Sequence, residues 1–154
     1  MAARIPQPRD QTVKQQKAAV RLTWNKAFGK DKTVMIDSAQ KYIDSECIRL
    51  MVRYTPARNN ILYKTPTLGT RIGSGHIYYQ SPSARYLYYG FLMVSRLTGS
   101  SWAKNGESKV LTNRKLKYST AKHPQAKARW FETMKTNHKE QILRGAAAIT
   151  KKGR

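Results

Sequence analysis

The sequence predicts an α+β fold, in which N-terminal helices and a C-terminal helix pack on a small, mainly antiparallel sheet of three to five strands. Apolar residues recur at helical spacing near both ends of the chain. The middle holds short runs of aromatic and branched residues, bounded by Gly and Pro, that are typical of strands. Strands grouped between helices favour helices gathered on one face of a sheet. A chain of 154 residues is long enough to bury the core of one such domain.

Three parts are expected along the chain. Residues 1–10 form an N-terminal arm, residues 11–145 form a single α+β domain, and residues 146–154 form a basic C-terminal tail. The arm and the tail hold too little apolar content to fold alone, so we expect neighbouring subunits to order them. Within the domain, residues from about 95 to 124 are predicted to form an exposed basic loop.

Two helices are predicted to open the domain. The first covers about residues 11–28, because apolar side chains recur seven, four and four residues apart on one helical face: Val13, Val20, Trp24 and Phe28. Gly29 ends this helix. The second covers about residues 33–53, with an apolar stripe whose members lie three to four residues apart: Ile36, Ala39, Ile43, Cys47, Leu50 and Tyr54.

Short strands and a short helix are predicted next. Aromatic and branched residues fit a pleated, half-buried surface, and they predict strands at Ile61–Lys64, Thr67–Ile72, Ile77–Tyr79 and Phe91–Val94. Ser83–Gly90 is expected to form about two helical turns with Gly90 just past the end. Leu116–Thr120 is expected to be an edge-like strand whose lysines discourage unwanted pairing. The last helix is predicted from Pro124 to about Leu143, with Gly145 beyond it.

Residues 74–94, SGHIYYQSPSARYLYYGFLMV, form the most aromatic stretch of the chain. A tyrosine has an apolar body and a polar tip, so these side chains suit a domain core and also suit a subunit interface. Trp102 lies in the polar loop that follows, where a lone Trp either packs back on the core or docks a partner. Six aromatic residues are therefore candidates for a subunit interface: Tyr78, Tyr79, Tyr86, Tyr88, Tyr89 and Trp102.

The net charge constrains the partners of the chain. Thirty Lys and Arg residues against eight Asp and Glu give +22, and a single domain this basic repels itself. We therefore expect a polyanion such as double-stranded DNA or RNA, or an acidic neighbouring protein. Basic residues gather between positions 104 and 129, and six of them are candidates for a DNA-facing or ring-docking surface: Lys104, Lys109, Arg114, Lys115, Lys117 and Lys122.

The motifs argue against an enzyme, a metal site, a cofactor and a membrane protein. The single cysteine, Cys47, excludes an internal disulfide, and its place on a helical stripe favours core packing. The three histidines have no metal-ligand spacing: His76, His123 and His138. The acidic residues are scattered, although Asp37 and Asp44 could share a helix face. No apolar run could span a bilayer and no signal peptide is apparent, so a soluble protein made in a reducing compartment is expected.

Three motifs, in order, resemble small neck proteins of long-tailed bacteriophages, which are described as minor capsid or tail-completion proteins. The motifs are Tyr54-Thr55-Pro56, the segment Pro82–Gly90 (PSARYLYYG) and the segment Trp130–Lys139 (WFETMKTNHK). The resemblance spans roughly residues 33–148. It departs at Ser83, where the family commonly has Tyr.

The resemblance implies a structural protein of the virion, made in the host cytoplasm, that joins the portal side of the capsid to the tail. Such proteins form rings through which DNA passes. The expected partners are copies of this chain in a six- or twelve-fold ring, neighbouring neck, portal-side and tail proteins, and double-stranded DNA bound without sequence preference. The neck layer (adaptor, stopper, tail-completion or terminator) stays open. The alternative that charge supports equally well is a sequence-independent nucleic-acid-binding protein.

Overall fold

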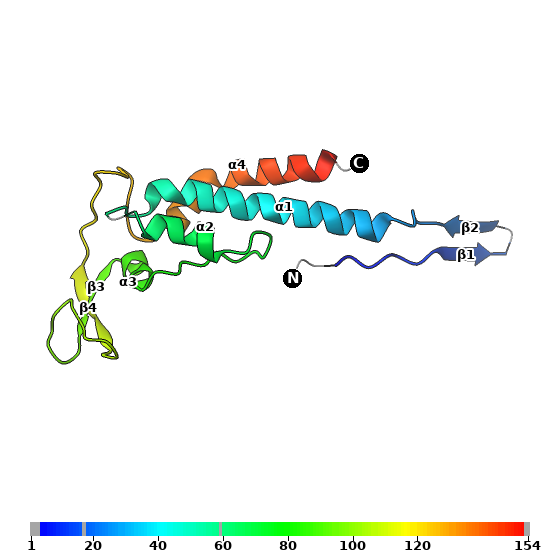
Figure 1. Cartoon of the computed structure of the whole chain (residues 1–154). Coiled ribbons are helices and arrows are strands. Elements are labelled where there is room, and N and C mark those ends of the chain that lie inside the picture. The colour runs from blue at the N-terminus through cyan, green and yellow to red at the C-terminus, as the bar shows by residue number, and fades with distance from the viewer. Residues whose placement is uncertain (1–3, 17, 59, 153–154) are drawn as a thin grey trace.

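The computed structural model describes residues 4–16, 18–58 and 60–152, and it has the predicted α+β class in an elongated molecule (Figure 1). In chain order the elements are β1 (Gln11–Gln15), β2 (Ala18–Leu22), α1 (Phe28–Met51), α2 (Thr65–Gly69), α3 (Ala84–Tyr89), β3 (Phe91–Ser95), β4 (Lys109–Lys115) and α4 (Trp130–Lys152). Short 3₁₀ helices lie at Val52–Tyr54 and Leu62–Lys64. The strands form two separate antiparallel hairpins, β1–β2 and β3–β4, in place of the single sheet expected.

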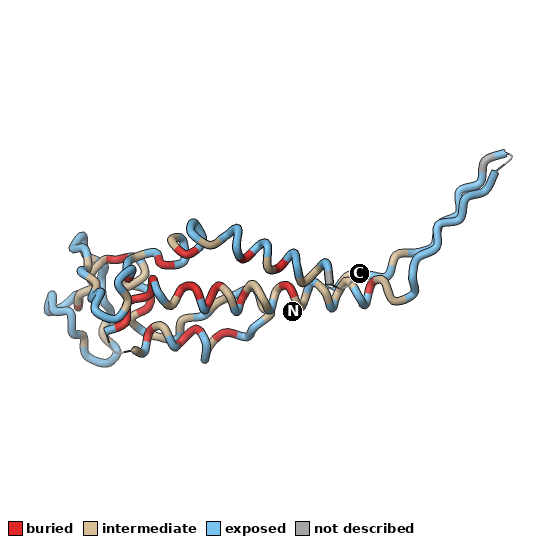
Figure 2. Tube along the Cα trace, turned by 90° about the horizontal axis from the view of Figure 1, so that it is seen from above, coloured by how far each residue is buried: buried red, intermediate tan, exposed pale blue. Residues whose placement is uncertain are grey.

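The core lies between α1 and α4, which run side by side along the molecule (Figures 1 and 2). The second half of α1 carries the predicted stripe into this core, whereas Ile36 near its start is exposed. Burial of Leu50 and Met51, each 2% exposed, stabilises the fold by roughly 2 kcal/mol per side chain. The buried cluster contains Cys47, Leu50, Met51, Tyr54, Leu62, Ala84, Trp130, Met134 and Ile142.

The last helix differs from the prediction at both ends. It begins at Trp130, and it continues through the segment predicted as a tail, at least to Lys152. Gly145, expected beyond the helix, lies inside it, because α4 passes close to Tyr42 of α1 there. A Cβ on Gly145 would overlap the hydroxyl and ring of Tyr42. Glycine therefore leaves room for the Tyr42 side chain where it lies, and Ala146 beside Gly145 is buried.

The predicted helix over residues 11–28 is wrong, because these residues form the β1–β2 hairpin before α1 begins at Phe28. Val13 and Val20 are cross-strand partners, so the seven-residue spacing that suggested a helical face arises from hairpin pairing. The preceding arm packs on the start of α1: the Ile5 N–H donates to Thr33 Oγ1 at 3.0 Å, and the Gly29 N–H donates to Gln7 Oε1 at 2.9 Å. Part of the arm is thus held by its own chain.

The middle of the chain holds fewer strands than predicted. Residues 61–72 form a 3₁₀ turn and α2 instead of two strands, and Ile77–Tyr79 is not a strand. The helix and strand predicted around Gly90 are confirmed as α3 and β3, and Gly90 has the left-handed φ of 82° that favours glycine. The partner of β3 is β4 at Lys109–Lys115, inside the segment predicted as a loop, and Leu116–Thr120 is not a strand.

Candidate assembly and DNA-contact surfaces

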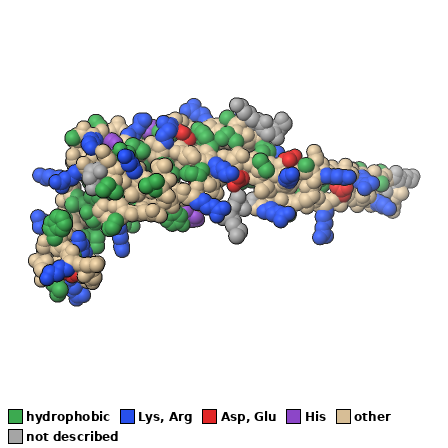
Figure 3. Space-filling view, viewed as in Figure 1, with side chains coloured by type: hydrophobic (Ala, Val, Ile, Leu, Met, Phe, Trp, Pro, Cys, Tyr) green, Lys and Arg blue, Asp and Glu red, His purple; other side chains and the backbone are tan. Residues whose placement is uncertain are grey.

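The six candidate basic residues are all exposed and follow the β3–β4 hairpin and its return to α4. Lys104 lies in the loop at the end of the hairpin, Lys109 begins β4, and Arg114 and Lys115 end it. Lys117 and Lys122 lie on the connection to α4, where Lys122 Nζ donates to Asn60 Oδ1 at 2.9 Å. The candidates are therefore spread along the hairpin and its return to the helices. Figure 3 shows cationic side chains on the projecting part of the molecule, separated by apolar and uncharged ones.

Residues 96–108, here the Trp102 loop, are held by a network around Ser95, which is 1% exposed. The Ser95 hydroxyl accepts the Leu97 and Thr98 N–H groups at 3.2 and 3.0 Å and donates to Glu107 Oε1. Glu107 Oε2 accepts the Lys104 N–H at 2.9 Å. These two donors, the Ser95 hydroxyl first, hold the pKa of Glu107 below its ordinary value. The loop is thus ordered by its own polar groups, without an apolar anchor from Trp102.

Three of the six aromatic candidates are half-buried and three are exposed. Tyr79 and Tyr88 flank the core, where their rings lie 5.5 and 4.8 Å from the Trp130 ring. Burial raises the pKa of Tyr79, and burial together with the nearby Glu132 carboxylate raises the pKa of Tyr88. Tyr86 is half-buried. Tyr78, Tyr89 and Trp102 are 56%, 50% and 84% exposed, so they are available to a partner.

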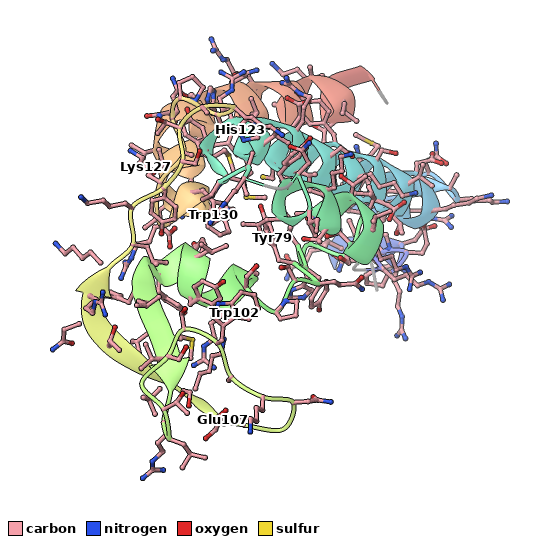
Figure 4. All side chains as sticks on the ribbon, turned by 60° about the vertical axis from the view of Figure 1, so that its left-hand side comes forward. Tyr79, Trp102, Glu107, His123, Lys127 and Trp130 are labelled. Carbon is pink, nitrogen blue, oxygen red and sulfur yellow. The ribbon has the colours of Figure 1, made fainter. Side chains whose placement is uncertain are left out.

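A groove of about 470 Å³ lies beside these tyrosines. Met51, Tyr79 and Trp130 lie among the residues that line it, and Tyr88, Tyr89 and Phe131 contribute further aromatic surface. Tyr88 is oriented by its hydroxyl, which donates to Glu132 Oε2 at 2.5 Å. Figure 4 shows Tyr79 and Trp130 pointing into the space between the helical core and α3. The groove is mainly apolar, which suits the insertion of apolar side chains from another surface.

The β1–β2 hairpin is a candidate surface that the sequence interpretation missed. It projects from the start of α1 away from the core (Figures 1 and 2), and every described residue of β2 is exposed. Its pairing register places Val13, Val20 and Leu22 on one face, and these side chains are 63%, 69% and 50% exposed. The opposite face carries Lys14 and Arg21. The sequence carries only a weak signal for it, since Val20 and Leu22 alternate with Arg21 while residues 11–15 hold one apolar residue, Val13.

Four of the residues considered for catalysis or metal binding are buried or contact groups of their own chain. Cys47 is buried, and its burial, with a smaller contribution from Asp44, raises the pKa of the thiol. Asp44 is 3% exposed and accepts hydrogen bonds from Gln40, Gly73 and Gly75. His123 contacts the Thr55 carbonyl, and His138 contacts the Tyr54 hydroxyl. Among the described residues, no three His, Cys, Asp or Glu side chains gather as a metal site, and no helix is long and apolar enough to cross a membrane.

Comparisons of the chain with protein-family models, with curated proteins and with solved structures find no match in any of the three. The resemblance of the three motifs to phage neck proteins therefore stays a prediction. What the geometry adds is a basic projecting hairpin (β3–β4), a projecting hairpin with Val13, Val20 and Leu22 on one face (β1–β2), and an aromatic groove on one elongated molecule.

Proposed function

We propose that the chain is a structural subunit of the head–tail junction of a bacteriophage, which assembles into a ring in the virion and lets double-stranded DNA pass. The observation that carries this proposal is the projecting β1–β2 hairpin. An isolated two-stranded hairpin is marginally stable in water, and this one exposes Val13, Val20 and Leu22 on a single face. A second copy that covers this face removes the exposed apolar area from water, which favours association.

Charge supports the second half of the proposal. A ring of six such chains would carry 6 × 22 = +132, because each chain carries +22. Charge of this size is tolerated only beside a polyanion or acidic proteins. The exposed cations Arg114, Lys115, Lys117 and Lys122 suit phosphate contacts, which carry no sequence information and so permit DNA of any sequence to pass.

The oligomeric state tests the ring. Light scattering after gel filtration should give a closed oligomer for the native chain and a smaller species for a variant with Val13→Thr and Val20→Thr. Threonine keeps the strand preference and removes the apolar face. The free energy of unfolding of the subunit should change by less than about 0.5 kcal/mol, as for exposed positions generally. Val34→Thr, at a position that is 57% exposed on α1, is the matched control. A native chain that stays monomeric at all concentrations, with or without DNA, would rule out the ring.

Salt dependence tests the DNA contact. Changing Arg114, Lys115 and Lys117 to Gln should reduce the slope of log affinity against log salt by roughly 0.9 for each phosphate that the variant no longer neutralises. A control variant changes three exposed cations on α4 to Gln: Lys135, Lys139 and Arg144. An equal reduction of the slope in both variants would show that only the net charge of the chain affects DNA binding, and it would rule out a specific DNA contact by the β3–β4 hairpin.

A sequence-independent nucleic-acid-binding protein is the second candidate, and the exposed cations of the β3–β4 hairpin favour it equally. The two candidates differ in assembly. A chain that binds duplex DNA or RNA tightly while it remains monomeric supports the second candidate, since a ring requires contacts between copies.

A further inference from the structure

The Trp102 loop combines exposed apolar side chains with an ordered backbone. Trp102 and Leu97 are each 84% exposed, more than any of the other large apolar side chains described. The backbone beneath them is fixed by the Ser95 network, by the Trp102 N–H, which donates to Ser100 Oγ at 3.1 Å, and by Lys109 Nζ, which donates to the Ser101 carbonyl at 2.8 Å. Figure 4 shows Trp102 and Glu107 on the loop of the projecting hairpin, with Glu107 farther from the helical core. Binding of a partner would therefore cost little entropy for ordering this loop.

The charge around Trp102 selects the chemistry of the partner. Arg96, Lys104 and Lys109 are exposed around the loop, and the one acid, Glu107, is engaged by Ser95 and the Lys104 N–H. Tryptophan and arginine are the residue types most enriched among the side chains that dominate binding at protein interfaces. A matching surface needs an apolar pocket for Trp102 and a rim of carboxylates.

A second copy of this chain offers the apolar groove beside Tyr89, but no Asp or Glu is among the described residues that line it. The chain carries eight acidic residues in all. Six of them already contact groups of their own chain: Asp10, Asp37, Asp44, Glu46, Glu107 and Glu132. The remaining two, Asp31 and Glu140, lie far apart in sequence on different helices. Duplex DNA has the charge but no preformed apolar pocket, and insertion of an apolar side chain between its bases costs a few kcal/mol per step.

We infer that the Trp102 loop docks into an apolar pocket, rimmed by Asp and Glu, on a different and acidic protein. This inference goes beyond the proposed ring and does not depend on the phage assignment. It concerns Trp102, Lys104 and Lys109 at the loop end of the β3–β4 hairpin. The ring depends on the β1–β2 hairpin, and the DNA test depends on cations at the other end of β4 and beyond it. Failure of one of these tests therefore leaves the others standing.

Site-specific photocrosslinking in the cells that make the protein tests the inference. A photoreactive phenylalanine analogue replaces Trp102 in the full chain, and the matched control places it at Leu68, which is 82% exposed on α2. The expected result is an adduct with one acidic protein from position 102 and none from position 68. An adduct with another copy of this chain or with nucleic acid would overturn the inference. So would the absence of any adduct beyond the control.

Direct binding to the captured protein completes the test, since capture alone does not show the mode of docking. The purified full chain should bind it, and Trp102→Ala should weaken binding by at least about thirtyfold, the size expected for a dominant interface tryptophan. Trp102→Phe should retain part of the affinity, and Leu68→Ala should leave it unchanged. Changing Arg96 and Lys104 to Gln should lower the association rate and its salt dependence. An unchanged affinity in Trp102→Ala would overturn the inference, because this variant alters an exposed side chain and leaves the core intact.

Discussion

Asp44 should be a determinant of stability, and replacing it with Ala should destabilise the subunit. Its buried carboxylate joins α1 to the turn at residues 73–75. Oδ2 accepts the Gly73 N–H at 2.8 Å and the Gly75 N–H at 3.1 Å, and Oδ1 accepts Gln40 Nε2 at 2.7 Å. Gly73 and Gly75 both have positive φ, 91° and 73°, so the turn itself is one that glycine permits.

The size of the effect follows from these hydrogen bonds. A hydrogen bond to a charged group contributes about 1.5–3 kcal/mol net when its partner is withdrawn from water. The Gly73 N–H is half-buried and loses most of this value in Asp44→Ala, whereas the exposed Gly75 can bond to water instead. We expect a decrease of roughly 2–3 kcal/mol in the free energy of unfolding, or about 4–10 °C in Tm for a domain of this size.

Two variants make the measurement specific. Asp44→Asn should cost only about 1 kcal/mol, because its oxygen can still accept both backbone N–H groups while Gln40 turns its amide to accept from the new NH₂. Glu140→Ala, an exposed acid on α4, gives the same change in net charge and should be neutral. Denaturant unfolding followed by circular dichroism measures all three. A decrease below about 0.5 kcal/mol in Asp44→Ala would refute the reasoning from these hydrogen bonds.

Three further predictions concern other parts of the molecule. Gly145→Ala should destabilise the native chain because the new Cβ overlaps Tyr42. In a Tyr42→Ala background the same change should stabilise the chain by up to about 1 kcal/mol, because Ala has a higher helix propensity than Gly. Thermal unfolding of the four chains of this double-mutant cycle measures both effects. The Trp102 loop should be fully ordered above pH 4.5, the ordinary pKa of a Glu, and should lose its order as the pH falls through the lowered pKa of Glu107 in the folded chain. The NMR chemical shift of the Lys104 amide measures this change with pH, and Glu107→Gln should abolish it. Cys47 should react with thiol reagents only upon unfolding, because burial raises its pKa and shields it.

The parts of the fold that the sequence predicted well are those whose apolar pattern is set by burial. The second half of α1 needs one buried face, so Cys47 and Leu50 repeat at helical spacing. The α3–β3 junction needs a left-handed residue, and Gly90 marks it. The candidate cations were also located correctly as exposed, because charged side chains rarely leave water.

The parts that could not be predicted are those with no buried face. β4 is exposed at nearly every residue, so its sequence, KVLTNRK, carries no alternation, and its register is decided by backbone pairing to β3. The β1–β2 hairpin projects without a core, so Val13 and Val20 pair only with each other and their spacing imitates a helix. Sequence also could not separate Tyr79, which packs on Trp130, from Tyr78, which is exposed, because adjacent residues face opposite ways.

A ring imposes one more condition on the β1–β2 hairpin. If two equivalent hairpins met each other, the contact would be isologous and would close as a dimer, whereas a ring needs contact with a different surface of the next copy. The groove beside Tyr89 lies in the other half of the elongated molecule, is mainly apolar and fits this requirement (Figure 1). Cysteine substitution separates the cases, since the native Cys47 is buried. Val13→Cys together with Tyr89→Cys should give, after oxidation, a series of disulfide-linked oligomers up to the full ring on a non-reducing gel. Val13→Cys alone should give no disulfide-linked species. Disulfide-linked dimers from Val13→Cys alone would show that the hairpin meets its equivalent, and a ring built through this hairpin would then be excluded.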